Sequence, residues 1–109
     1  MGSALPQADP TRALLNRLWQ RSLPLLHERM DLLDRTAAAA EAGTLTADLR
    51  DHAIAEAHKL AGSLGMFGYS EGTRLARQIE DLLEAPAAPP PGRLRALTTE
   101  LRTLLFPPS

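Results

Sequence analysis

His58 is the residue whose type and setting most favour chemistry in this sequence. Plotted at 100° per residue, the apolar positions around it fall within about 80° of a helical wheel, and His58 lies about 140° from their centre. We therefore expect its imidazole to face solvent. The apolar positions are Leu49, Ala53, Ala57, Leu60 and Leu64.

Small residues surround His58 on this predicted helix. Gly62 and Gly65 follow it one and two turns later, and Ala55 and Ala61 lie alongside. Glycine inside a helix costs about 0.8 to 1 kcal/mol relative to alanine, so its use here requires a reason. Close approach of a partner's surface is one reason. The alternative for Gly65, and for Gly68 after it, is that they simply end the helix.

An exposed imidazole is suited to nucleophilic attack on phosphorus. Imidazole has an ordinary pKa near 6.5, so it is partly neutral near pH 7, and its unprotonated nitrogen attacks without a separate deprotonation step. The reaction then needs a group that keeps the other ring nitrogen protonated, and it needs no metal or cofactor on this chain.

Four segments with helical apolar periodicity position this residue. The first begins at Asp9-Pro10 and runs to Gly43, the second follows Thr44 or Thr46 and frays between Gly65 and Gly68, the third runs from Ser70 to Ala85, and the fourth runs from about Pro91 to Phe106. Pro24 predicts either a kink in one long helix or a break between two. The apolar residues of the first segment, among them Leu14, Leu18, Leu25 and Leu32, form one continuous stripe.

Length and composition favour one all-α domain. The 109 residues suffice for a single core, and Ala and Leu supply most of the 44% hydrophobic content while aromatic residues contribute only 4%. Short connections favour an antiparallel up-and-down four-helix bundle over residues 9–106, with a disordered segment at 1–8 and a tail at 107–109.

Charge and cysteine content narrow the classes of partner and site. Twelve basic residues face thirteen acidic ones, so we expect neither nucleic acid nor a membrane surface as partner. There is no Cys and no apolar run of about 18 residues, which favours a cytoplasmic protein, and we expect a monomer. His52 and Glu56 are spaced for a metal but lack a third ligand, so no metal site is expected.

Residues 57–84 resemble a known family. The string Ala57-His58-Lys59-Leu60-Ala61-Gly62-Ser63, followed by Gly65, Phe67, Gly68 and the stretch Leu75 to Glu80, is similar to the histidine phosphotransfer domain family and to the phosphoacceptor domain of chemotaxis histidine kinases. The likeness extends in layout to about residues 10–105. It implies a four-helix bundle whose second helix exposes the phosphorylated imidazole.

The resemblance also implies roles for individual residues. In the family, a polar side chain 22 residues after the phosphoacceptor bonds the inner ring nitrogen, and Glu80 occupies that position here. A lysine often found three residues after the histidine is replaced by Ala61 in this sequence. Lys59 lies about 100° around the helix from His58 and is a candidate for contact with a phosphoryl oxygen.

The function implied is that of a phosphocarrier in a two-component phosphorelay. A receiver aspartate or a histidine kinase would phosphorylate His58, and a response-regulator receiver would take the phosphoryl group. The chain itself would not be an enzyme, since it has no phosphate-binding glycine loop and no acidic metal pocket, and catalytic residues and Mg²⁺ would come from the partner. The alternative is a helical module that docks on a receiver without being phosphorylated.

Overall fold

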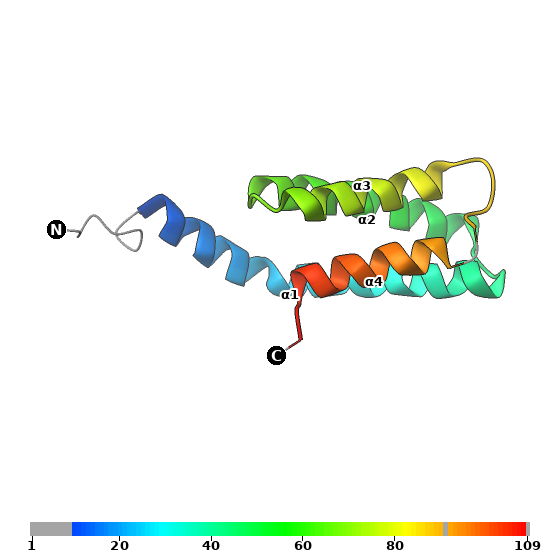
Figure 1. Ribbon diagram of the computed structural model, residues 1–109, viewed down its shortest axis with the longest axis horizontal. Helices are drawn as coiled ribbons and strands as arrows, with labels where there is room; N and C mark the ends of the chain where they lie inside the picture. The colour runs from blue at the N-terminus through cyan, green and yellow to red at the C-terminus, as the bar shows by residue number, and fades with distance from the viewer. Residues whose placement is uncertain (1–9, 91, 109) are drawn as a thin grey trace.

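Four helices account for the secondary structure of the chain in a computed structural model, which describes residues 10–90 and 92–108. They are α1 (Pro10–Ala42), α2 (Ala47–Met66), α3 (Ser70–Glu84) and α4 (Arg93–Leu105). They run up and down as a bundle (Figure 1), which confirms the predicted all-α class. No helix within the described ranges is long and apolar enough to cross a bilayer. The segment predicted to be disordered at residues 1–8 lies outside these ranges, and the domain limits stay a prediction.

α1 is one helix that continues through Pro24. Proline has no N–H for the helical hydrogen bond and its ring crowds the carbonyl four residues earlier, so a bend is expected there. Figure 1 shows the N-terminal part of α1 running in a different direction from the part inside the bundle. The structure thus favours one bent helix over two separate ones.

The apolar stripe of α1 contributes to the core only in its second half. Burial begins at Leu26, whereas Leu14 is 48% exposed and Leu25 is exposed as well. The apolar stripe is thus continuous in sequence but buried only in its second half. At 1.5 Å per residue, the 33 residues of α1 span about 50 Å and the 13 residues of α4 only about 20 Å, so α1 extends beyond the helix that packs along it.

The ends of α2 are fixed by side-chain and glycine caps. The N–H of Leu49 donates to Thr46 Oγ1 at 3.1 Å, so Thr46, and not Thr44, is the N-cap. At the other end Gly68 has φ +82°, a conformation that favours glycine, and the N–H of Tyr69 donates to the carbonyl of Leu64 at 2.9 Å. Gly68 therefore ends the helix, while Gly65 lies inside it.

The core draws on all four helices. Its fully buried large side chains include Met30, Leu33, Leu60, Leu64, Leu75, Ile79 and Leu101. Leu104 is exposed, and Leu49 and Leu82 are only partly buried. The periodicity located the apolar faces correctly, but the edges of each face depend on how closely the neighbouring helix packs.

Polar side chains fasten α4 to α1. The Arg102 guanidinium donates to Asp31 at 2.7 Å and to Asp34 at 2.8 Å. Partial burial disfavours the charged form of Arg102, but these hydrogen bonds outweigh it and raise its pKa. Arg95 pairs with Glu41 nearer the other end of α4, at 2.8 Å.

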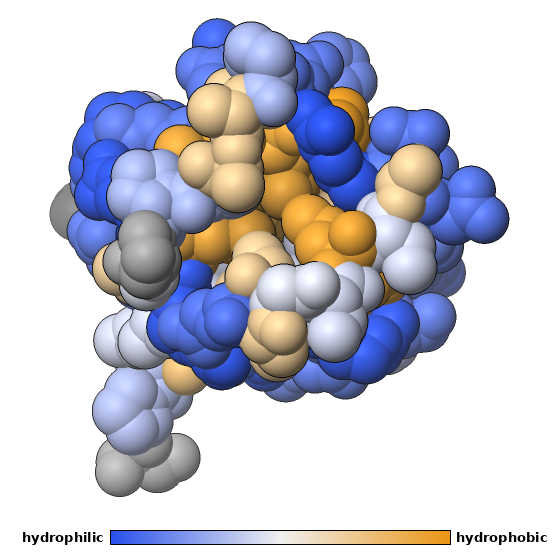
Figure 2. Space-filling view, turned by 90° about the vertical axis from the view of Figure 1, so that its right-hand side faces the viewer, coloured by the Kyte–Doolittle hydropathy of each residue, from blue (hydrophilic) through white to orange (hydrophobic). Residues whose placement is uncertain are grey.

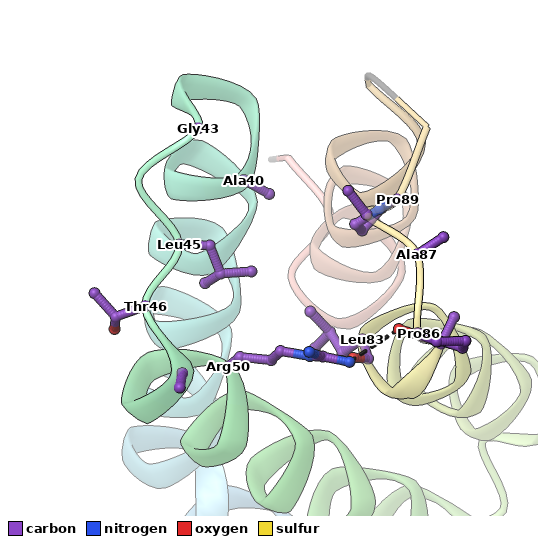
Figure 3. Close-up of a pocket in the computed structure, with 12 residues that line it drawn as sticks. Ala40, Gly43, Leu45, Thr46, Arg50, Leu83, Pro86, Ala87 and Pro89 are labelled. Carbon is purple, nitrogen blue, oxygen red and sulfur yellow. Dashed lines mark hydrogen bonds between the residues drawn. The ribbon is translucent and has the colours of Figure 1, made fainter.

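The bundle end that carries the α1–α2 loop is closed by Arg50. A hollow of about 420 Å³ lies at this end of the bundle, between the α1–α2 loop and the segment from Ala85 to Pro89. Figure 2 views this end of the molecule and shows hydrophobic side chains at its centre, ringed by hydrophilic ones. In Figure 3 Arg50 reaches across the hollow, where its guanidinium donates to the carbonyls of Leu83 at 2.6 Å and Ala85 at 2.9 Å. These carbonyls belong to the last turn of α3, so the role of Arg50 is to cap that helix.

Replacing Arg50 with Ala should lower the free energy of unfolding by about 1 to 2 kcal/mol, because two partly buried carbonyls lose charged donors. Arg50→Lys should lose less, since one ammonium still reaches a carbonyl. Urea denaturation followed by circular dichroism measures both, with the exposed Arg93→Ala as control. Equal stability of all three variants would contradict the capping role.

Candidate functional site

His58 lies on the exposed face of α2 and bonds to a carboxylate of α3. Its side chain is 76% exposed, and its Nδ1 lies 3.1 Å from Glu80 Oε2. The Glu80 side chain is only 17% exposed. The imidazole is therefore accessible along its outer edge and anchored at its inner one.

The register between α2 and α3 brings these two residues together. The helices are antiparallel, so a residue later in α2 lies at the same height as a residue earlier in α3. Thr73 Oγ1 donates to the carbonyl of Ala61 at 3.1 Å, which fixes the register close to the site. At this register, residues 58 and 80 lie at the same height on adjoining helices.

The hydrogen bond determines which nitrogen of a neutral His58 is free. An ionised carboxylate only accepts hydrogen bonds, so Nδ1 donates its N–H to Glu80 and Nε2 carries the lone pair. Because the ring is mostly exposed, Nε2 faces solvent. The geometry thus presents one oriented nucleophilic nitrogen at the surface.

A shallow groove of about 380 Å³ adjoins the imidazole. Its lining comes from the facing surfaces of α2 and α3 and consists of His58, Ala61, Gly62, Arg77, Glu80, Asp81 and Glu84. Three of these side chains are carboxylic acids and one is an arginine. The volume of the groove is at the low end of the range of about 300 to 1,000 Å³ found for ligand pockets.

The predicted small residues do leave the surface beside His58 open. A Cβ added to Gly62 would meet no atom within 4 Å, and one added to Gly65 would lie 3.5 Å from Thr73 Oγ1. Ala55 is exposed, whereas Ala61 is 4% exposed and adds to the opening only by being short. Packing within the chain therefore does not require glycine at position 62.

The Lys59 side chain contacts Glu56 and does not line the groove beside His58. Its Nζ lies 3.3 Å from Glu56 Oε2, and the other oxygen of Glu56 accepts from Arg29 Nε at 3.2 Å. This ion pair holds the ammonium beside α1, away from the groove that His58 lines.

Among the described residues no group of three potential ligands could hold a metal ion, and His52 lines a groove with Glu56 and residues of α1.

One residue of the groove was not assigned a role by sequence reasoning. Arg77 lines the groove, although the wheel of α2 could not reveal a residue of α3. Trp19 packs α1 onto the bundle through an aromatic cluster: it stacks on Tyr69 at 4.7 Å and meets the edge of Phe67 at 5.2 Å. This cluster attaches the overhanging part of α1 to the α2–α3 turn.

Comparison with known proteins agrees with this geometry. The family model described as the Hpt domain matches residues 17–105. The chain belongs to the Hpt domain family. The protein RcaC of Microchaete diplosiphon is 37% identical over 68 residues, which cover 62% of this chain and 10% of that relative. The chain therefore corresponds to only a small part of RcaC, and no solved structure matches it significantly.

Family membership indicates histidine phosphotransfer in two-component signalling. Hpt domains are phosphocarriers that interact with receiver domains and histidine kinases. The described helices α1 to α4 fall within or overlap the matched range, and so do His58 and Glu80.

Gly62→Ala should raise the free energy of unfolding by about 0.5 to 1 kcal/mol, because alanine is the better helix former and the added methyl meets open space. Gly68→Ala is the matched control, and it should lower stability because its φ of +82° is strained for alanine. Thermal and urea denaturation measure both. A destabilised Gly62→Ala variant would show that the chain itself needs this glycine.

Proposed function

We propose that His58 Nε2 is the phosphoacceptor of this Hpt domain and that Glu80 orients its ring. The domain then receives the phosphoryl group from a receiver aspartate or a histidine kinase and passes it to a response-regulator receiver. The observation that carries the proposal is the 3.1 Å contact between His58 Nδ1 and Glu80 Oε2 on a ring that is otherwise exposed.

The transfer from an aspartyl phosphate balances without any further reactant. The lone pair of Nε2 forms the P–N bond while the bond between phosphorus and the aspartyl oxygen breaks, and its electron pair leaves with the carboxylate. Nδ1 keeps its proton throughout. The ring acquires a formal positive charge, which the Glu80 carboxylate stabilises at 3.1 Å.

Glu80 acts here by position and charge. With an Nδ1–H donor held on Oε2, the ring neither rotates away nor adopts the tautomer that would protonate Nε2. The partial burial of the Glu80 side chain strengthens this contact relative to a fully exposed pair. The same contact stabilises the phosphorylated ring, which favours a phosphohistidine that persists until the next receiver arrives.

The partner supplies the remaining catalytic groups. Phosphoryl transfer is catalysed mainly by in-line positioning and by charge that neutralises the phosphoryl oxygens, commonly with Mg²⁺. The open surface around His58, Ala55, Gly62 and Gly65 allows a receiver to bring such groups up to the exposed Nε2. In this role the domain presents a nucleophile and is no enzyme by itself.

His58→Gln should abolish phosphorylation while the fold is preserved, because an exposed side chain contributes little to stability. His52→Gln, also exposed and on α2, is the matched control and should keep full acceptance. The measurement is acid-labile, base-stable label on the chain after incubation with phosphorylated receivers from the same cell. Label retained in His58→Gln would place the acceptor elsewhere, and binding without label on the wild type would favour the docking module.

Glu80→Ala should slow acceptance roughly five- to thirty-fold, as expected for losing a charged hydrogen bond of about 1 to 2 kcal/mol. The exposed Glu84→Gln on the same face of α3 is the control. ¹⁵N NMR of the imidazole should show that the Nδ1–H tautomer predominates in the wild type and is less populated in Glu80→Ala. Wild-type rates with an unchanged tautomer ratio would make Glu80 an ordinary surface acid.

A further inference from the structure

We propose that Arg77, on α3, is the cation that holds the phosphoryl oxygens of phosphorylated His58, in place of a cation on α2. The inference rests on the proposed function of His58. It assigns to this chain a binding contact that neither Lys59 nor Ala61 is placed to make.

Arg77 and His58 line the same groove. Arg77 precedes Glu80 by three residues on α3, so the two side chains lie on one face, about 4.5 Å apart along the helix axis. Glu80 in turn contacts the imidazole ring. An arginine side chain is long enough to cover one turn and bring its guanidinium beside a group bound to His58 Nε2.

The register of the two helices places Arg77 opposite Ala61. Three steps from His58 to Ala61 along α2 correspond to three steps back from Glu80 to Arg77 along α3, and Ala61 and Arg77 both line the groove beside the imidazole. The short side chain of Ala61 leaves room there for the guanidinium. The guanidinium of Arg77 is therefore at about the height that a cationic side chain at position 61 of α2 would occupy.

The charges of the groove show why a cation is needed. A phosphoryl group on Nε2 brings about two negative charges to a surface that already carries Glu80, Asp81 and Glu84. Arg77 is the one lysine or arginine among the groove's lining residues, all of which the structure describes. A guanidinium also matches phosphoryl oxygens with two parallel donors, which a single ammonium does not.

Arg77 is available for this contact, in contrast to other arginines of the bundle. Within the described ranges no hydrogen bond or ion pair joins it to another residue, and it is exposed. By comparison Arg29 pairs with Glu56, Arg74 with Glu71, and Arg102 with two aspartates of α1. The Lys59 ammonium is likewise held on Glu56.

The test uses potassium phosphoramidate, a small phosphoryl donor, so that no partner contributes charge. Phosphorylation of the full chain is followed by ³¹P NMR, which gives the rate of label formation on His58, its hydrolysis half-life and the second pKa of the phosphoryl group. Arg77→Gln should slow formation and shorten the half-life, each roughly three- to tenfold. It should also raise the phosphoryl pKa, because the guanidinium favours the dianion.

Three further variants separate this contact from a general charge effect. Arg74→Gln removes an arginine one turn away that pairs with Glu71, and it should behave as wild type. Arg77→Lys should retain part of the effect. Ala61→Lys added to Arg77→Gln should restore it from the opposite helix, with circular dichroism as the check that each variant is folded.

The outcomes distinguish this proposal from that for His58. Absence of label at His58 on the wild type would remove the proposed function itself. Normal labelling with an unchanged rate, half-life and phosphoryl pKa in Arg77→Gln would overturn only the role of Arg77. Loss of these properties in Lys59→Gln, with Arg77→Gln unaffected, would assign the contact to Lys59 instead.

Discussion

The antiparallel register of α2 against α3 is the constraint on which the site depends. His58 and Glu80 belong to different helices, and only their alignment at one height lets Nδ1 and Oε2 meet at 3.1 Å. The bond from Thr73 to the Ala61 carbonyl and the close packing at Gly72, where an added Cβ would lie 2.9 Å from Leu64, fix that alignment. A slip by one turn would leave His58 without its carboxylate and Glu80 partly buried without its donor.

The rest of the bundle maintains this register. α1 and α4 pack against the pair and are joined to each other by Arg102 and Arg95, so the apolar face beneath α2 and α3 remains covered. At one end Arg50 caps α3 across the hollow between the two loops, and at the other end Trp19 stacks on Tyr69 beside the α2–α3 turn. Both ends of the α2–α3 pair are therefore fastened, while its outer face stays open.

The outer face combines helix stability with access. Gly62 weakens the intrinsic helix propensity of α2, and Ala61 contributes little bulk, yet the core residues Leu60 and Leu64 keep the segment helical. Tertiary packing thus offsets the cost of the small residues. The resulting surface has only small side chains around the imidazole on α2 and carries acidic groups on α3.

The sequence by itself determined the helical class, a helix start at Thr44 or Thr46 and an end between Gly65 and Gly68, and the exposure of His58, because periodicity, caps and wheel position are local properties of the chain. The resemblance in residues 57–84 pointed to Glu80 in advance, and the structure places it on His58. Tertiary structure alone decided that α1 extends past its partners, that Lys59 pairs with Glu56, and that Arg77 lines the same groove as His58. These depend on the relative lengths and register of helices far apart in sequence, and no local pattern encodes which charged side chain will lie across a groove from another.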